Sequence, residues 1–206
     1  MARQARPRTS GFRPAPFDVV EASRRVWLEQ WDEPAAASGM AVFVAILRSF
    51  ELLKDEVDQV MKRHDLTFAR FEILMWLATD PESSLTLSWI SKTLRIPSAT
   101  VTNLIDRLEL DKLLRRVPHP TDARTTLAVI TPRGRAVTKE ATRDLNASVY
   151  EPLGLSEAKR SQLTELLAEL RVSGNEFDVL RSQEVIDEVG ARHALSNART
   201  RTKKGN

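Results

Sequence analysis

A compact polar face marks the segment 98–111. Its apolar residues recur at spacings of three and four, so one side of a helix buries Val101, Leu104, Ile105 and Leu108. The opposite side presents small hydrogen-bonding groups and one arginine, namely Ser98, Thr100, Thr102, Asn103 and Arg107. Hydroxyl, amide and guanidinium groups can hydrogen-bond to the edges of nucleobases or to phosphate oxygens. The alternative is an ordinary exposed helix face that binds nothing.

Charged side chains further along the chain extend this chemistry. Arg107, toward the end of the helix, and Arg116, beyond it, are predicted to contact phosphates rather than bases. Arg124 lies in a predicted turn, where an arginine can enter a narrow A·T minor groove. Asp122 would repel phosphates, so we predict that it orients an arginine, either Arg124 or Arg116. The alternative for Asp122 is an ordinary aspartate-stabilised turn.

Positive charge is concentrated in the same part of the chain. The whole chain carries a net charge of +3. Residues 91–135 hold nine basic and four acidic side chains, which leaves this segment at +5 and the rest of the chain at −2. Charge localised in this way is typical of a surface that neutralises phosphates, although any single run of arginines is more often a solvated face.

Two helices and a hairpin are predicted to position these side chains. Residues 86–94 form an amphipathic helix, and the corner at 95–97 ends it because proline disfavours helical geometry in the residue before it. With the helix 98–111 this makes a helix-turn-helix. Residues 113–117 and 125–131 then predict two β-strands joined by a turn, that is, a basic wing.

Further helical patterns flank this module. Residues 17–31 predict a short helix, 34–39 interrupt the pattern, and Thr67 and Ser156 are predicted helix caps. Pro132 is predicted to start another helix, as the first helical residue. The segment 40–63 carries a heptad-like apolar stripe able to pack against another long helix, made of Phe43, Ile46, Phe50, Leu53, Val57 and Val60.

Four fragments together resemble one protein family. They are the stretches 101–109 (VTNLIDRLE), 113–116 (LLRR), 120–124 (PTDAR) and 130–134 (ITPRG). This combination resembles the MarR family of bacterial winged helix-turn-helix regulators, over roughly residues 40–172. The chain departs from the family's pattern at four positions. Arg95 and Lys112 stand where glycine is usual, which predicts backbone strain. Asn103 and Ala123 stand where arginine is common, which alters the predicted DNA contacts.

The resemblance implies a mainly α fold with a small β-hairpin wing, in which a winged helix-turn-helix lobe joins a helical dimerisation region. The predicted parts are an N-terminal extension with a short helix (1–39), the dimerisation region (40–66 and 132–173), the lobe (67–131) and a basic, flexible C-terminal extension (174–206). The implied function is sequence-specific binding of a homodimer to a pseudo-palindromic DNA site with half-sites roughly 34 Å apart. Repression relieved by a small aromatic or anionic ligand is the implied regulation.

In this family an effector commonly binds between the dimer base and the DNA-binding lobe. The aromatic and histidine side chains available for such a site are Phe43, His64, Phe68, Phe71 and Trp76. Plain core packing is the favoured alternative for them, because aromatic residues at helical spacing usually serve as core.

Other classes of function find little support in the sequence. It has no cysteine, no glycine-rich phosphate loop, no Ser-His-Asp constellation and no cluster of metal ligands, so we predict no enzyme activity and no cofactor. The longest apolar run, 40–47, is far short of the roughly 20 residues that a membrane span needs, and we expect a cytoplasmic protein. The alternatives to a ligand-responsive regulator are a winged-helix scaffold for protein partners and an architectural DNA binder without an effector.

Overall fold

The computed structural model describes residues 15–122, 124–177, 182, 183 and 186. The chain divides into two compact units, residues 1–68 with 143–152, and residues 69–142 with 153–206. The predictions for residues 1–14 and for the basic tail 190–206 lie outside the described residues, as does most of the helix predicted over 177–189.

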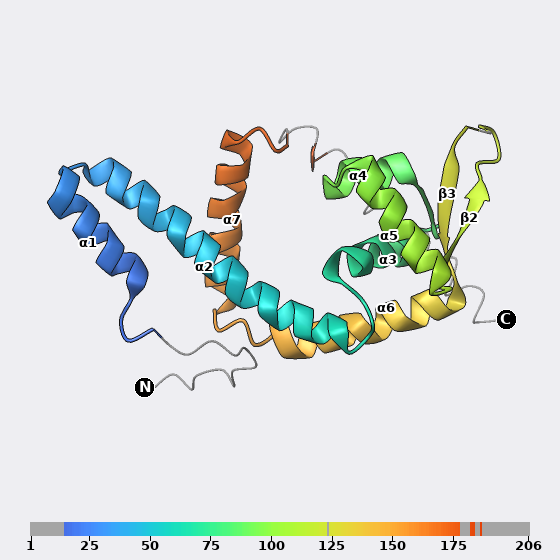
Figure 1. The fold of residues 1–206 in the computed structure, drawn as a ribbon, viewed down its shortest axis with the longest axis horizontal. Helices are drawn as coiled ribbons and strands as arrows, with labels where there is room; N and C mark the ends of the chain where they lie inside the picture. Colours follow the sequence, from blue (N-terminus) through green and yellow to red (C-terminus); the bar gives the residue numbers. More distant parts are fainter. Residues whose placement is uncertain (1–14, 123, 178–181, 184–185, 187–206) are drawn as a thin grey trace. The chain divides into compact units, whose positions relative to one another are not determined.

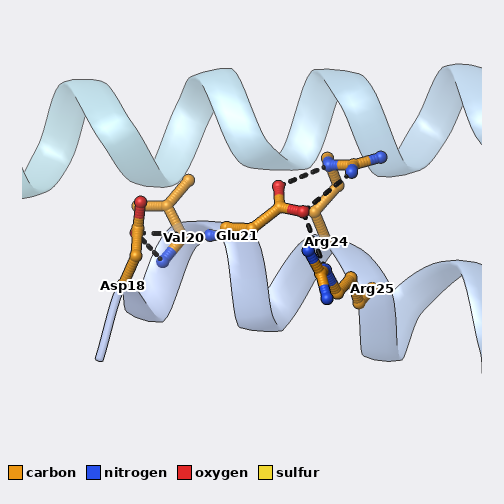
Figure 2. Close-up of polar contacts among 5 residues, drawn as sticks. All are labelled: Asp18, Val20, Glu21, Arg24 and Arg25. Carbon is orange, nitrogen blue, oxygen red and sulfur yellow. Dashed lines mark hydrogen bonds and ion pairs between the residues drawn. The ribbon is translucent and has the colours of Figure 1, made fainter. Parts of the chain in front are cut away.

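The first unit begins with α1 (Val19–Trp31), which packs along α2 (Pro34–Lys62) (Figure 1). Figure 2 shows how its first turns are held: Asp18 caps the helix by accepting the main-chain N–H groups of Val20 and Glu21 at 3.0 and 3.3 Å. The Glu21 carboxylate pairs with Arg24 at 2.9 Å and Arg25 at 2.8 Å. These hydrogen bonds, first from Arg24 and then from Arg25, lower the pKa of Glu21 to about 2.

The prediction that residues 34–39 interrupt helical structure is wrong. Only two residues, at 32 and 33, separate the helices: Asp32 adopts a left-handed conformation (φ 50°) that ends α1, and α2 begins at Pro34. Proline suits this first position because its missing N–H would have no partner there. The alanines that follow favour helix and continue it.

The far end of α2 is buried, whereas most of its length is not. Val60 and Met61 are buried in the first unit, as are Leu145 and Val149 near the end of the long segment formed by α6 (Pro132–Leu145) and the π-helix η1 (Asn146–Tyr150). Closer to its start, α2 exposes large apolar side chains. By length and composition α2 alone among the described residues is a candidate membrane span, contrary to the expectation from the short apolar run. The same pattern fits a helix covered by another helix.

The second unit contains the helix-turn-helix and a sheet. Its helices are α3 (Phe68–Thr79), α4 (Leu87–Leu94), α5 (Ser98–Leu110) and α7 (Glu157–Ser173). The first residue of α3, Phe68, belongs to the first unit. The core between α3, α4, α5 and the sheet consists of fully buried aliphatic side chains, including Ile73, Leu74, Leu77, Ile90, Val101, Ile105, Leu108, Leu114 and Ala128. Trp76 of α3 meets Trp89 of α4 edge to face, with ring centroids 5.4 Å apart. Ser156 is the N-cap residue of α7, as predicted, although its side chain makes no capping hydrogen bond.

The sheet has three antiparallel strands, one more than predicted. β2 (Leu114–Pro118) and β3 (Thr126–Ile130) form the hairpin, and β1 (Ser84–Thr86) pairs with the other edge of β3, giving the order β1-β3-β2. Ser84 lies opposite Val129, and Leu114 opposite Ile130. Ala128 and Ile130 of β3 are buried, whereas Leu127 and Val129 on its other face are only partly buried. β1 has only three residues, too few to produce a readable alternation.

Candidate nucleic-acid interface

The helix-turn-helix is built by caps at each end of α4. Thr86 accepts the main-chain N–H of Trp89 at 3.1 Å and starts the helix. Arg95 ends it in a left-handed conformation, with φ 52° and ψ 38°. The Ser91 hydroxyl then donates to the Ile96 carbonyl at 2.7 Å and fixes the corner. α5 therefore starts at a defined position and angle, as a helix that reads DNA requires.

The predicted polar face of α5 is exposed in the structure. Ser98, Thr100, Thr102, Asn103 and Arg107 are all exposed, while Val101, Ile105 and Leu108 on the other side are buried. The Thr102 hydroxyl donates to the Ser98 carbonyl at 3.0 Å within the helix. In the described part of the chain Arg107 has no ion pair, so its guanidinium is available to an anionic partner. The face thus offers donors and acceptors with no bulky apolar group.

Arg116 is placed differently from the other predicted contacts. It lies on β2, its side chain is 26% exposed, and its guanidinium pairs with Asp106 at 2.5 Å and with Glu109 at 2.9 Å. Its main-chain N–H also donates to Glu109 at 2.8 Å. Partial burial lowers the pKa of Arg116, but the hydrogen bonds that its guanidinium donates to Asp106 and then to Glu109 outweigh this and raise the pKa. Arg116 is therefore engaged within the protein.

The turn of the wing is organised by Asp122. Its carboxylate accepts the main-chain N–H of Arg124 at 3.0 Å and the Thr125 hydroxyl at 2.7 Å. These hydrogen bonds, the hydroxyl first, lower the pKa of Asp122. They are the contacts of an aspartate-stabilised turn, the alternative considered for this residue, rather than of a pair with a guanidinium. Arg124 is exposed beside this turn.

Both glycine replacements noted in the sequence fall at positions of positive φ. Arg95 has φ 52° and Lys112 has φ 59°, in the left-handed region where a residue with a Cβ is strained. The strain predicted from the sequence is thus confirmed at the level of backbone conformation. The chain keeps its two sharp helix ends, at positions 95 and 112, without glycine.

Sequence reasoning missed the internal partners of several charged groups. Glu109 and Asp106 were not predicted to act in the site, and their spacing with Thr102 on one face of α5 was the available signal. Arg135, counted in the basic segment, donates to the Ala78 carbonyl at 2.7 Å and the Ser83 hydroxyl at 2.5 Å. Part of the positive charge therefore stabilises the lobe.

The residues predicted for an effector site are divided between the two units. Phe43, His64 and Phe68 belong to the first, and Phe71 and Trp76 to the second. Phe43 is 62% exposed, whereas Phe71 is buried. His64 Nε2 lies 3.1 Å from a carboxylate oxygen of Asp144. Among the described residues there is no group of three histidine, aspartate or glutamate side chains placed to hold a metal ion.

Comparison with known proteins places this geometry in a family. The sequence model of the MarR family matches residues 64–125. The HTH-type transcriptional regulator MhqR of Bacillus subtilis is 27% identical over 139 residues, covering 67% of this chain and 94% of MhqR.

Two solved structures extend the match. Sco5413, a MarR family transcriptional regulator from Streptomyces coelicolor, is 36% identical with a TM-score of 0.62, covering 68% of this chain and 98% of that one. The S. aureus MepR–DNA complex is 26% identical with a TM-score of 0.58, covering 64% and 96%. With its helix-turn-helix, its wing and this identity over nearly the whole length of Sco5413, the chain belongs to the MarR family of transcriptional regulators.

Proposed function

We propose that this chain is a sequence-specific DNA-binding repressor that acts as a homodimer in the cytoplasm. The observation that carries the proposal is the exposed polar face of α5 next to a wing with an exposed arginine at its turn. A major groove admits an α-helix, and hydroxyl and amide side chains on such a helix read base edges. The similarity to a MarR-type protein solved with DNA supports the same use here.

Each predicted contact except Arg116, which is engaged within the protein, has a defined role in this proposal. Thr100, Thr102 and Asn103 face base edges, and Ser98 and Arg107 face phosphates. Arg124 enters the minor groove, where negative potential is enhanced in narrow A·T tracts. Asp122 keeps the turn in the shape that presents Arg124. Because Asn103 and Ala123 replace common family arginines, the preferred site differs from a family consensus.

The direct test is fluorescence anisotropy with the DNA upstream of the chain's own gene and with duplexes selected from a random pool. We expect saturable binding that weakens as salt rises and that prefers one sequence. Arg124→Ala should weaken it, with Arg133→Ala as a comparison outside the predicted contacts. An absence of salt-sensitive, sequence-preferring binding to every duplex would refute DNA reading and favour the protein-scaffold alternative.

Exposed apolar side chains support the homodimer. Phe50 on the heptad-like stripe of α2 is 57% exposed, and Leu166 on α7 is 55% exposed. On α2 alone several large apolar side chains are exposed, and such exposure marks an interaction site. A second copy supplies the long helices that such a stripe needs. We infer that helices outside the lobe hold two copies together, which presents two α5 helices to successive major grooves.

Oligomeric state measured by light scattering tests this part. The wild-type chain should be a dimer without detergent, Phe50→Glu should weaken the dimer, and the neighbouring exposed position Ser49→Glu should not. A wild-type monomer that partitions into lipid vesicles would instead assign α2 to a membrane.

We further propose that a small aromatic or anionic ligand relieves repression. The candidate contacts remain Phe43, His64, Phe68, Phe71 and Trp76. A ligand that binds the folded protein raises its melting temperature by mass action, so benzoate and its hydroxylated derivatives should be screened by thermal shift. Any hit should also release DNA in the anisotropy assay. If no compound does both, the architectural DNA binder without an effector is the better description.

A further inference from the structure

We propose that Arg116 is a positioning residue that clamps the wing strand β2 to α5 through Glu109 and Asp106, rather than a phosphate contact. The proposal rests on the proposed function, because a clamp between these two elements matters only if they read DNA together. It also reassigns the residue for which the sequence favoured phosphate binding.

The clamp spans about two turns of α5. Arg116 Nη1 donates to Asp106 and Glu109, and Nη2 lies 3.4 Å from the Thr102 carbonyl oxygen. Positions 102, 106 and 109 are separated by four and three residues, so they form one stripe along the helix. A planar guanidinium with five N–H donors can bond several such acceptors at once from the adjacent strand.

Charge argues against a phosphate role for this arginine. Arg116 with Asp106 and Glu109 carries a net charge of −1, so the group as a whole does not attract an anion. To reach a phosphate, the guanidinium would have to leave two charge-assisted hydrogen bonds, which are the stronger kind. Exposed Arg107, on the same helix, is free of ion pairs in the described part of the chain and is the better phosphate ligand.

Glu109 holds both the side chain and the backbone of the strand. One carboxylate oxygen accepts from the guanidinium at 2.9 Å and the other accepts the main-chain N–H of Arg116 at 2.8 Å. Both bonds act at Arg116, the third residue of the strand, so the strand is fixed there against α5, and this sets where the wing stands relative to the base-reading face. Loss of Glu109 should release the strand even though Arg116 remains.

Substitution of Glu109 distinguishes a clamp from a phosphate contact at Arg116, because the two roles predict opposite changes in DNA affinity. The variants are Glu109→Gln, Arg116→Met and their combination, with Glu140→Gln as a matched control because Glu140 is an exposed carboxylate of α6. The probe is the strongest duplex recovered from a random pool, titrated at several salt concentrations. The clamp predicts that Glu109→Gln weakens binding about fivefold or more although it removes a negative charge. The double variant should lose less affinity than the two single losses added together, because both substitutions break the side-chain pair of Glu109 with Arg116.

A phosphate contact predicts the opposite pattern. Glu109→Gln would then free the guanidinium and leave binding unchanged or tighter, and Arg116→Met would reduce the slope of log affinity against log salt by about 0.9. Arg107→Met should show that slope change and serves as the positive control. The phosphate pattern at Arg116 would overturn the clamp.

A measurement without DNA tests the clamp even if the protein does not bind DNA. Hydrogen exchange at the Arg116 main-chain amide should accelerate about tenfold or more in Glu109→Gln, since the amide loses a charged acceptor. Unchanged exchange there would overturn the clamp. Wild-type protein that binds no duplex would refute DNA reading alone, and the exchange result would still decide the clamp.

Discussion

Replacing Lys112 by glycine is expected to stabilise this protein. Lys112 follows α5 with φ 59°, and a left-handed conformation costs a residue with a Cβ about 1–2 kcal/mol. The conformation is imposed by the end of the helix. The Lys112 N–H donates to the Glu109 carbonyl at 2.9 Å and the Leu113 N–H donates to the Leu108 carbonyl at 2.9 Å, the pair of bonds that turns the chain out of α5.

The size of the gain follows from two opposing terms. Glycine removes the strain but is more flexible in the unfolded chain, which costs about 0.5–1 kcal/mol. The net gain is about 0.5–1 kcal/mol, because the lysine side chain is exposed and, within the described residues, makes no ion pair that would be lost. For a chain of this length that raises the melting temperature by about 1–4 °C.

Urea unfolding at fixed protein concentration measures this difference. Lys112→Ala is the matched control, since it removes the charge but keeps the Cβ and therefore the strain. Lys112→Asn should fall between alanine and glycine, because asparagine tolerates this conformation better. The reasoning is refuted if glycine is no more stable than alanine at position 112.

Three further predictions follow from close contacts and shifted pKa values. In Gly134→Ala the new Cβ would lie 1.9 Å from the Leu113 carbonyl oxygen, so the main chain must move and stability should fall by about 1–3 kcal/mol; an unchanged urea midpoint would contradict this. Asp122 has a pKa below its usual value, so the order of the wing turn is present above the unfolded pKa and is lost as pH falls through the folded pKa; the protection factor of the Thr125 amide should fall on acidification below about pH 4 in the wild-type chain, and a fall of the same size in Asp122→Asn would contradict this. Glu21 has a pKa of about 2, so the first turns of α1 should keep their ion pairs as pH falls from about 4.3 toward that value; a carboxyl carbon titrating near 4.3 by NMR would show that the pairs do not form in solution.

Much of the fold could be predicted from local pattern. The boundaries of α4 and α5 fall within a residue or so of their predicted ends, because a threonine cap, a proline corner and apolar spacing act over a few residues. The two wing strands were found for the same reason. The sequence does not predict β1, because three residues carry no period. The predicted interruption at 34–39 is wrong because Pro34 is the first helical residue of α2 and does not break the helix.

The interface could be predicted only in part. The exposure of Thr100, Thr102 and Asn103 follows from helical periodicity once the buried face is known. The partners of Arg116 and Asp122 do not follow from the sequence. Each of these charged groups has several possible partners at similar separations along the chain, and helical or strand periodicity does not indicate which of them it contacts.

The sequence by itself determined the helix-turn-helix, the wing, the concentration of positive charge and the strained positions 95 and 112, since each depends on residues close together in the chain. Only the tertiary structure decided that Arg116 is held by Asp106 and Glu109 and that Asp122 serves the turn. An ion pair forms between the charges that the fold brings within about 4 Å of each other. For Arg116 those charges are Asp106 and Glu109, ten and seven residues away in the sequence, and their separation along the chain does not reveal that closeness.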